Sequence, residues 1–82
     1  APILFKAIKK GQEIIEPDMR AADLEAAMKD VLASEPLANT EYVTAVDALT
    51  MQPVETIDRD VLVAMAVRIG TTRLIDNFSY HL

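Results

Sequence analysis

Val61-Leu62-Val63-Ala64-Met65-Ala66-Val67-Arg68-Ile69 is a nearly continuous apolar run, and its conformation decides the fold. It follows a polar bend at 58–60 and ends at Gly70. This pattern favours a central β-strand that is covered on one face and partly screened on the other. A buried helix is the alternative, because alanine and methionine are good helix formers.

Two further strands are predicted on the two sides of this run in the chain. Residues 42–48 alternate Tyr, Thr and Val in the manner of a half-buried strand, and residues 49–54 should form a turn or short irregular segment. Gly70 begins a tight turn into residues 73–79. Side chains of that last strand alternate between faces, with Leu74, Asp76, Phe78 and Tyr80 on one face and Arg73, Ile75, Asn77 and Ser79 on the other.

Apolar residues before Pro36 recur at helical spacing and predict two amphipathic helices. Pro17 cannot continue the first helix, Asp18 is predicted to be the N-cap of the second, and the second should end before Pro36. The apolar stripes consist of Leu4, Ile8, Gly11 and Ile15 in the first helix, and of Leu24, Ala27, Met28, Val31 and Leu32 in the second. The predicted fold class is therefore α+β: residues 1–82 form a single domain with two N-terminal helices packed on a small, mainly antiparallel three-stranded sheet.

Composition narrows the function classes. The chain has 82 residues, of which 51% are hydrophobic and 26% charged, and a net charge of -5, which disfavours nucleic acid and membrane partners. The absence of cysteine excludes disulfides, thiolate metal sites and a cysteine nucleophile, and it fits a cytoplasmic location. A chain of this size hides only about 60–65% of the surface of its unfolded form, so we expect a partner to cover part of it. No apolar run approaches the roughly 18 residues of a membrane-spanning helix, and no secretory signal is expected.

Side chains that could carry out catalysis are scarce. His81, the only histidine, is interpreted as a solvated terminal residue. The carboxylates of the second helix are predicted to lie on its solvent side; they are Asp23, Glu25 and Asp30. Two further carboxylates, Asp58 and Asp60, flank Arg59 and are explained by local turn hydrogen bonds. We predict no catalytic, cofactor-binding or metal-binding residue in this chain.

Nucleotide-binding patterns are also missing from the sequence. The two glycines cannot form a phosphate-binding loop; Gly11 is interpreted as a close helix contact or a helix end, and Gly70 as a turn residue. The four aromatic residues lack the interleaved basic residues of a base-stacking platform and are interpreted as core or interface residues. They are Phe5, Tyr42, Phe78 and Tyr80.

The segment Arg68 to Asn77, RIGTTRLIDN, places charged residues in an otherwise apolar hairpin. Arg73 is expected to pair with Asp76 or with Asp47 on the adjacent strand. This ion pair either fixes the register of the strands or belongs to a surface that meets something outside the domain.

Two motifs carry a resemblance to a known family. VDALTMQP at 46–53, followed by the apolar strand and RIGTTRLIDN at 68–77, closely resembles the C-terminal domain of the pantothenate synthetase (pantoate–β-alanine ligase) family. The order, spacing and helical N-terminal half extend the resemblance over almost the whole chain.

The resemblance implies that the parent is an ATP- and magnesium-dependent ligase that activates pantoate as an acyl-adenylate and transfers it to β-alanine. It also implies a lid domain, whose partner is an N-terminal nucleotide-binding domain that is absent from this sequence. The family's paired-histidine motif, its substrate-binding Lys, Asp and Gln, and its Ser-Ser-Arg signature have no counterpart here. We therefore expect the 82-residue chain to be inactive alone and to bind neither ATP nor Mg²⁺. A homodimeric parent is compatible with the resemblance.

Two rival hypotheses remain beside the lid. The first is a free-standing, non-catalytic interaction module that retains the lid fold. The second is a small enzyme in its own right, which the lack of any reacting group disfavours.

Overall fold

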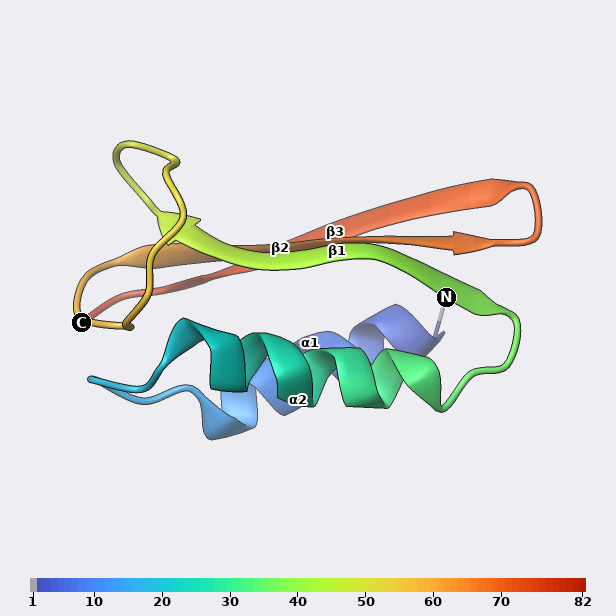
Figure 1. Cartoon of the computed structure of the whole chain (residues 1–82), viewed down its shortest axis with the longest axis horizontal. Coiled ribbons are helices and arrows are strands. Elements are labelled where there is room, and N and C mark those ends of the chain that lie inside the picture. The colour runs from blue at the N-terminus through green and yellow to red at the C-terminus, as the bar shows by residue number, and fades with distance from the viewer. Residues whose placement is uncertain (1) are drawn as a thin grey trace.

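The computed structural model describes residues 2–82 and consists of two layers, a pair of helices and a sheet (Figure 1). The strands form an antiparallel sheet in the order β1-β2-β3, and both helices lie on the same face of it. In chain order the elements are α1 (Pro2–Ile14), α2 (Ala21–Ala33), β1 (Ala38–Asp47), β2 (Val61–Ile69) and β3 (Thr72–Tyr80). The predicted α+β class with two N-terminal helices is confirmed.

The apolar run that decides the fold is the central strand β2, so the helical alternative is wrong. Four of its five odd-numbered side chains are fully buried beneath the helices, and Ile69 is half-buried. The four are Val61, Val63, Met65 and Val67. Its even-numbered side chains point to the other face, because successive residues of a strand alternate. Pairing with a strand on each side satisfies the backbone of β2, and this tertiary context outweighs the helix propensity of alanine and methionine.

Strand β1 begins earlier than the sequence predicted, at Ala38 and not at residue 42. Its first residues pair with the end of β2, and the register shifts between Thr40 and Tyr42 at a β-bulge. A bulge adds one unpaired residue and so interrupts the alternation of side chains on which the prediction relied. Strand β3 extends one residue beyond the predicted 73–79 at each end.

Gly70 occupies the two-residue turn between β2 and β3 and has a φ of 62°. Glycine adopts a positive φ without steric strain, and hairpin turns of this length require such a residue. The prediction that Gly70 supplies a turn is confirmed.

Helix α1 packs closely on α2 and β3 around Gly11. A Cβ atom at this position would lie 2.8 Å from Met28 Sδ and 3.0 Å from ring carbons of Phe78. Gly11 is therefore a close contact within a helix that continues to Ile14, and the alternative of a helix end is wrong. Buried side chains of the two helices are Ile3, Leu4, Ala7, Ala21, Leu24, Met28 and Leu32, whereas the predicted Ile8, Ile15, Ala27 and Val31 are half-buried.

Asp18 is not the N-cap of α2, contrary to the prediction. The cap residue is Arg20, whose side chain makes no capping hydrogen bond, and Asp18 has a φ of 67°. Backbone pairing with the segment before β2 takes the place of the side-chain cap: Ala21 N donates to Glu55 O at 2.8 Å, and Asp18 N to Ile57 O at 2.8 Å. Because a carbonyl of a distant segment accepts the first free N–H of the helix, no side-chain acceptor is needed there.

Neither helix in residues 2–82 is both long and apolar enough to cross a membrane.

Candidate functional site

Within residues 2–82, no layer covers the face of the sheet opposite the helices, and we call it the open face (Figure 1). Strand register places side chains from all three strands on it in rows. It consists of Tyr42, Thr44 and Val46 from β1, Leu62, Ala64, Ala66 and Arg68 from β2, and Arg73, Ile75, Asn77 and Ser79 from β3.

Two arginines lie side by side on the open face, at the end near the Gly70 turn. Arg68 and Arg73 are direct cross-strand partners of β2 and β3. Like charges in such a pair repel and destabilise the sheet. The carboxylate of Glu41 relieves this repulsion: Arg73 Nε donates to Glu41 Oε1 at 2.6 Å, and Arg68 Nη2 donates to Glu41 Oε2 at 3.3 Å. We call these three residues the Glu41 cluster.

The β-bulge of β1 explains how Glu41 reaches the two arginines. Glu41 is the extra residue between Thr40 and Tyr42, and a bulge can redirect a side chain that regular alternation would place on the other face. The hydrogen bond from Arg73, with the charges of Arg73 and Arg68, lowers the pKa of Glu41 despite a smaller opposing effect of desolvation. The same hydrogen bond raises the pKa of Arg73.

Arg73 therefore pairs with Glu41, and the predicted pairing with Asp76 or Asp47 is wrong. Asp76 is an odd number of residues from Arg73 and so projects from the opposite face of β3, where its Oδ1 accepts the backbone N–H of Asn77 at 2.8 Å. Asp47 pairs with Val61, at the far end of β2 from Arg68. The strand geometry thus separates both predicted partners from Arg73.

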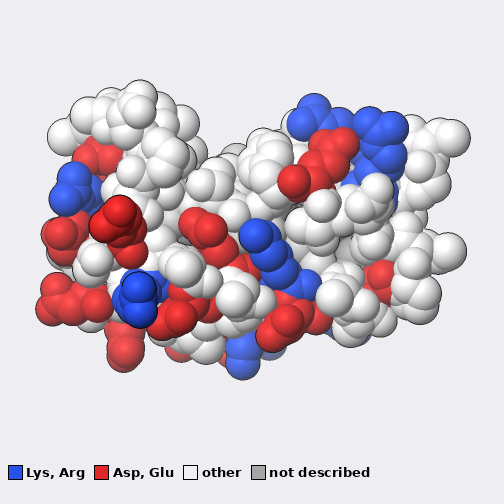
Figure 2. All heavy atoms as spheres, viewed as in Figure 1, with Lys and Arg blue, Asp and Glu red and all other residues white. Residues whose placement is uncertain are grey.

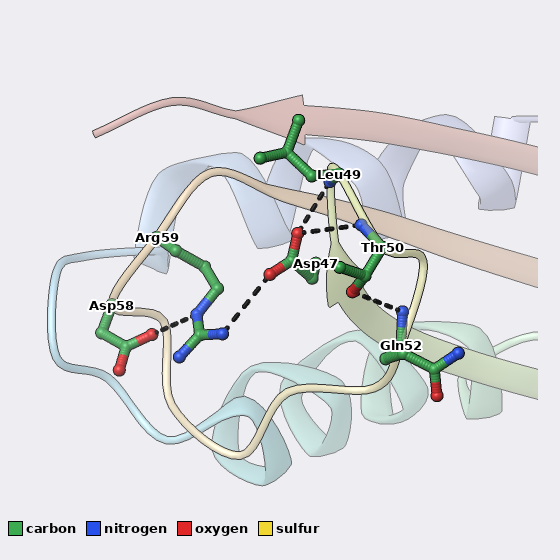
Figure 3. A network of polar contacts seen from close by, with 6 residues as sticks. All are labelled: Asp47, Leu49, Thr50, Gln52, Asp58 and Arg59. Atoms are coloured by element: carbon green, nitrogen blue, oxygen red, sulfur yellow. Dashed lines mark hydrogen bonds and ion pairs between the residues drawn. The ribbon is translucent and has the colours of Figure 1, made fainter.

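Asp47 organises the loop that follows β1 (Figure 3). Its Oδ1 accepts the backbone N–H groups of Leu49 at 2.7 Å and Thr50 at 3.2 Å, and its Oδ2 accepts Arg59 Nη1 at 3.3 Å. The two backbone hydrogen bonds and then the Arg59 guanidinium lower the pKa of Asp47. The aspartate of the VDALTMQP motif is therefore a turn-forming residue, which holds the loop above the end of the sheet.

Arg59 and its two flanking carboxylates differ in their contacts. Asp58 Oδ1 accepts Arg59 Nε at 2.7 Å, so the local explanation holds for Asp58. Asp60 instead contacts the chain end, where its Oδ1 accepts Leu82 N at 2.9 Å and its Oδ2 lies 3.5 Å from His81 Nδ1. The His81 side chain is 72% exposed, as expected of a solvated terminal residue.

Carboxylates of α2 agree with the prediction in two cases of three. Asp23 and Asp30 are exposed, but Glu25 is half-buried and its Oε2 accepts the backbone N–H of Ala45 at 3.1 Å. Glu25 thereby satisfies an edge N–H of β1, which the helical wheel does not reveal. Among residues 2–82, no three or more His, Cys, Asp or Glu side chains are grouped so that they could hold a metal ion.

A shallow polar groove lies between the start of α2 and the segment 53–56. Arg20, Glu25, Thr44 and Glu55 contribute to its lining. The carboxylate of Glu25 already accepts a hydrogen bond from the sheet edge, and the remaining groups do not form an acid–base pair with a nucleophile.

The four aromatic residues differ in burial. Phe78 is buried and Tyr80 half-buried, whereas Phe5 and Tyr42 are exposed.

Sequence reasoning missed two ion-pair partners. Glu41 pairs with Arg68 and Arg73, and Arg59 pairs with Asp47. Glu41 lies in a bulge, for which the local sequence offers no clear signal. Arg59 was assigned to a bend, and its contact with Asp47 across 12 residues depends on the path of the loop.

Comparisons with known proteins agree on one family. The family model described as pantoate-beta-alanine ligase matches residues 1–79. The pantothenate synthetase of Ruminiclostridium cellulolyticum is 51% identical over 81 residues, which cover 98% of this chain and 29% of that protein. The pantothenate synthetase of Roseiflexus sp. is 45% identical over 78 residues, which cover 94% of this chain and 28% of that protein.

A solved structure shares the fold. The crystal structure of pantothenate synthetase from Thermus thermophilus superposes with a TM-score of 0.79 at 24% identity, over 95% of this chain and 28% of that chain. The chain thus spans less than a third of the length of the relatives that it matches.

Proposed function

The chain belongs to the pantoate–β-alanine ligase family, and from this premise we propose that it is the C-terminal lid domain of an ATP-dependent ligase. The observation that carries the proposal is the extent of the match: nearly all of this chain aligns with 29% of a pantothenate synthetase, and the remainder of that protein has no counterpart here. In the proposed reaction of the whole enzyme, the pantoate carboxylate attacks ATP and releases pyrophosphate. The amine of β-alanine then displaces AMP from the acyl-adenylate.

We propose that the side chains of this domain hold neither Mg²⁺ nor phosphate. The described residues contain no grouped metal ligands, and the guanidiniums of Arg59, Arg68 and Arg73 are all paired with carboxylates. We therefore assign nucleotide, metal and both substrates to the remainder of the enzyme. No step of the chemistry is assigned to a residue of this chain.

A lid contributes to such a reaction by excluding water. An acyl-adenylate hydrolyses when water reaches it, and a domain that closes over the site protects the intermediate until the amine attacks. This role requires a fixed shape and a docking surface, and it requires no reacting group. Two further proposals follow from the family: a cytoplasmic location, and a parent enzyme that forms a homodimer.

The proposal can be tested by measuring AMP and pantothenate with the complete ligase, with this chain alone and with a ligase that lacks this domain. We expect the complete ligase to release one AMP for each pantothenate, and the 82-residue chain alone to release no AMP above a buffer control. A ligase truncated to lack these residues should release AMP in excess of pantothenate, because the intermediate is no longer shielded from water. A truncated enzyme that couples AMP and pantothenate one to one would contradict the lid role and favour a separate interaction module.

A further inference from the structure

We propose that the outer edge of β3 is a strand-pairing site for a second copy of this chain, and that Asp76 keeps this site closed. Two chains that pair at these edges form one continuous antiparallel sheet. The proposal concerns the strands of this chain alone, so it does not depend on the lid function.

The outer edge of β3 consists of the backbone groups that point away from β2. A two-residue turn connects β2 to β3, so Ile69 and Thr72 form the hydrogen-bonded pair next to the turn. Hydrogen-bonded pairs recur at every second residue of an antiparallel ladder, and the even-numbered residues of β3 therefore bond to β2. The residues whose backbone N–H and C=O groups point outward are Arg73, Ile75, Asn77 and Ser79.

The outer edge of β1, in contrast, is covered within the chain where β1 ends. Ala45 N donates to Glu25 Oε2 at 3.1 Å, and Ala45 O accepts Val54 N at 3.1 Å. Asp47 N donates to Gln52 O at 2.8 Å. Helix α2 packs along β1, and Figure 2 shows charged side chains over this helix. No further strand can therefore be added at this end of β1.

No segment of residues 2–82 covers β3 in this way. The outward residues of β3 have exposed side chains, and the hydrogen bond to their backbone comes from within the strand: Asn77 N donates to Asp76 Oδ1 at 2.8 Å. Unpaired N–H and C=O groups on an edge strand are a template for pairing with another strand. The edge of β3 is thus open to pairing except at Asn77.

A second copy of this chain fits the edge of β3 in an antiparallel register centred on Ile75. A twofold axis at this position places Ile75 opposite Ile75 of the second copy, and Arg73 opposite its Asn77. Ile75 is 57% exposed, so the contact between the two isoleucines buries apolar surface that a single chain leaves in water. The strand contains no proline, which would interrupt the pairing.

Asp76 opposes this pairing in two ways. Its carboxylate occupies the Asn77 N–H, which in the paired register donates to the C=O of Arg73 in the second copy. In the same register the Asp76 carboxylate lies opposite Leu74 of the second copy, and an apolar side chain then replaces water beside a charge. Both effects act twice in a dimer, because its twofold symmetry repeats each contact.

The test measures self-association of the 82-residue chain by sedimentation equilibrium. We expect Asp76→Ala to associate about tenfold more tightly than the unmodified chain, because each Asn77 N–H becomes free to pair. Asp30→Ala is the matched control, since it removes the same charge from an exposed position on α2. This control should associate no more tightly than the unmodified chain.

The double variant Asp76→Ala, Asn77→Pro shows whether the association occurs at the strand edge. Proline has no N–H, and at this position it removes an outward donor, so the pairing of β2 with β3 is kept. The double variant should return to the association constant of the unmodified chain. Ile75 is unchanged in this variant, so persistent tight association would come from apolar contact alone and would overturn the proposal.

Equal association constants for Asp76→Ala and Asp30→Ala would also overturn the proposal, because the effect would then follow net charge or be absent. Amide hydrogen exchange of Asp76→Ala provides the same test when the double variant does not fold. The amide protons of Ile75 and Asn77 should exchange more slowly in the associated state than in the monomer, whereas that of Ala45 at the edge of β1 should not change. Unchanged exchange at Ile75 and Asn77 would show that the chains associate elsewhere and would contradict the assignment to β3.

Discussion

The covered face and the open face of the sheet are made from alternate residues of the same strand, yet they differ in side-chain size. Odd positions of β2 carry Val61, Val63, Met65 and Val67, which fill the space beneath the helices. Two of its even positions carry the small Ala64 and Ala66, which lie between larger side chains of β1 and β3 on the other face. The covered face is therefore filled by side chains of β2 itself, whereas on the open face the side chains of the neighbouring strands cover Ala66, which is fully buried.

The two faces of the sheet also differ in their charged side chains. No charged side chain is buried in the described part of the chain, so the covered face depends on apolar packing alone. The open face contains an ion cluster that keeps donors exposed to solvent. Stability should therefore depend mainly on the covered face.

The largest expected effect comes from truncating a side chain of the covered face. Met65 is fully buried, so Met65→Ala should lower the free energy of unfolding by about 2–5 kcal/mol, the usual cost of removing a buried Met side chain. Ile75→Ala on the open face should change it by less than about 0.5 kcal/mol, as is typical of exposed sites. Urea unfolding of the 82-residue chain measures both, and equal losses would contradict the comparison.

An intermediate effect is expected from the loop at one end of the open face. Asp47→Asn removes the charge that Arg59 contacts, and the variant should be less stable than the parent sequence at pH 7. The pKa of Asp47 is lowered by folding, so its contribution is complete above the unfolded value of about 3.9 and is lost as the pH falls through the folded value. The difference in stability between the two proteins should therefore shrink below about pH 4.

Thermal unfolding between pH 3 and 7 measures this difference, with Thr50→Ala as the control. Thr50→Ala removes the Oγ1 acceptor of Gln52 N without changing any charge, so its stability relative to the parent sequence should not vary with pH in this way. A constant difference for Asp47→Asn across the range would show that folding does not shift the Asp47 pKa.

The smallest effect is expected from the Glu41 cluster, because its side chains are partly exposed and water screens their interaction. Glu41→Gln leaves Arg68 and Arg73 as a like-charge cross-strand pair and should slightly lower the melting temperature at low salt. Added salt should narrow the loss, since the Debye length falls to about 10 Å at 0.1 M. The double variant Glu41→Gln, Arg73→Gln should regain the lost stability, and a loss that is independent of salt would indicate that packing and not charge is responsible.

Periodicity predicted the elements well where one pattern continued without interruption. Residues 61–69 were correctly assigned to the central strand, and Pro17 and Pro36 correctly separated the helices from each other and from the sheet. The prediction failed where a local irregularity or a distant segment intervened. The bulge at Glu41 interrupts the alternation of side chains, so the predicted strand began too late. Backbone hydrogen bonds with residues 55–57 replace the side-chain cap that was predicted at Asp18.

The candidate surface was only partly predictable. Arg73 was identified as a charged residue in an apolar hairpin, but its partner was wrong, because an ion pair depends on strand register as well as on the presence of opposite charges. The exposure of Tyr42 and Ile75 could not be derived from their residue types, since both are commonly buried. Glu25 shows the reverse, because a residue assigned to the solvent side contacts the edge of β1.

The sequence by itself determined the fold class, the family and the central position of β2, because hydrophobic periodicity and the two motifs are local properties of the chain. Only the tertiary structure decided which carboxylate meets Arg73, which face remains uncovered and where the loop after β1 lies. These features depend on the register between strands and on a bulge that adds a single residue. A shift of one residue moves a side chain to the opposite face of a sheet, so such contacts are fixed only when the strands have paired.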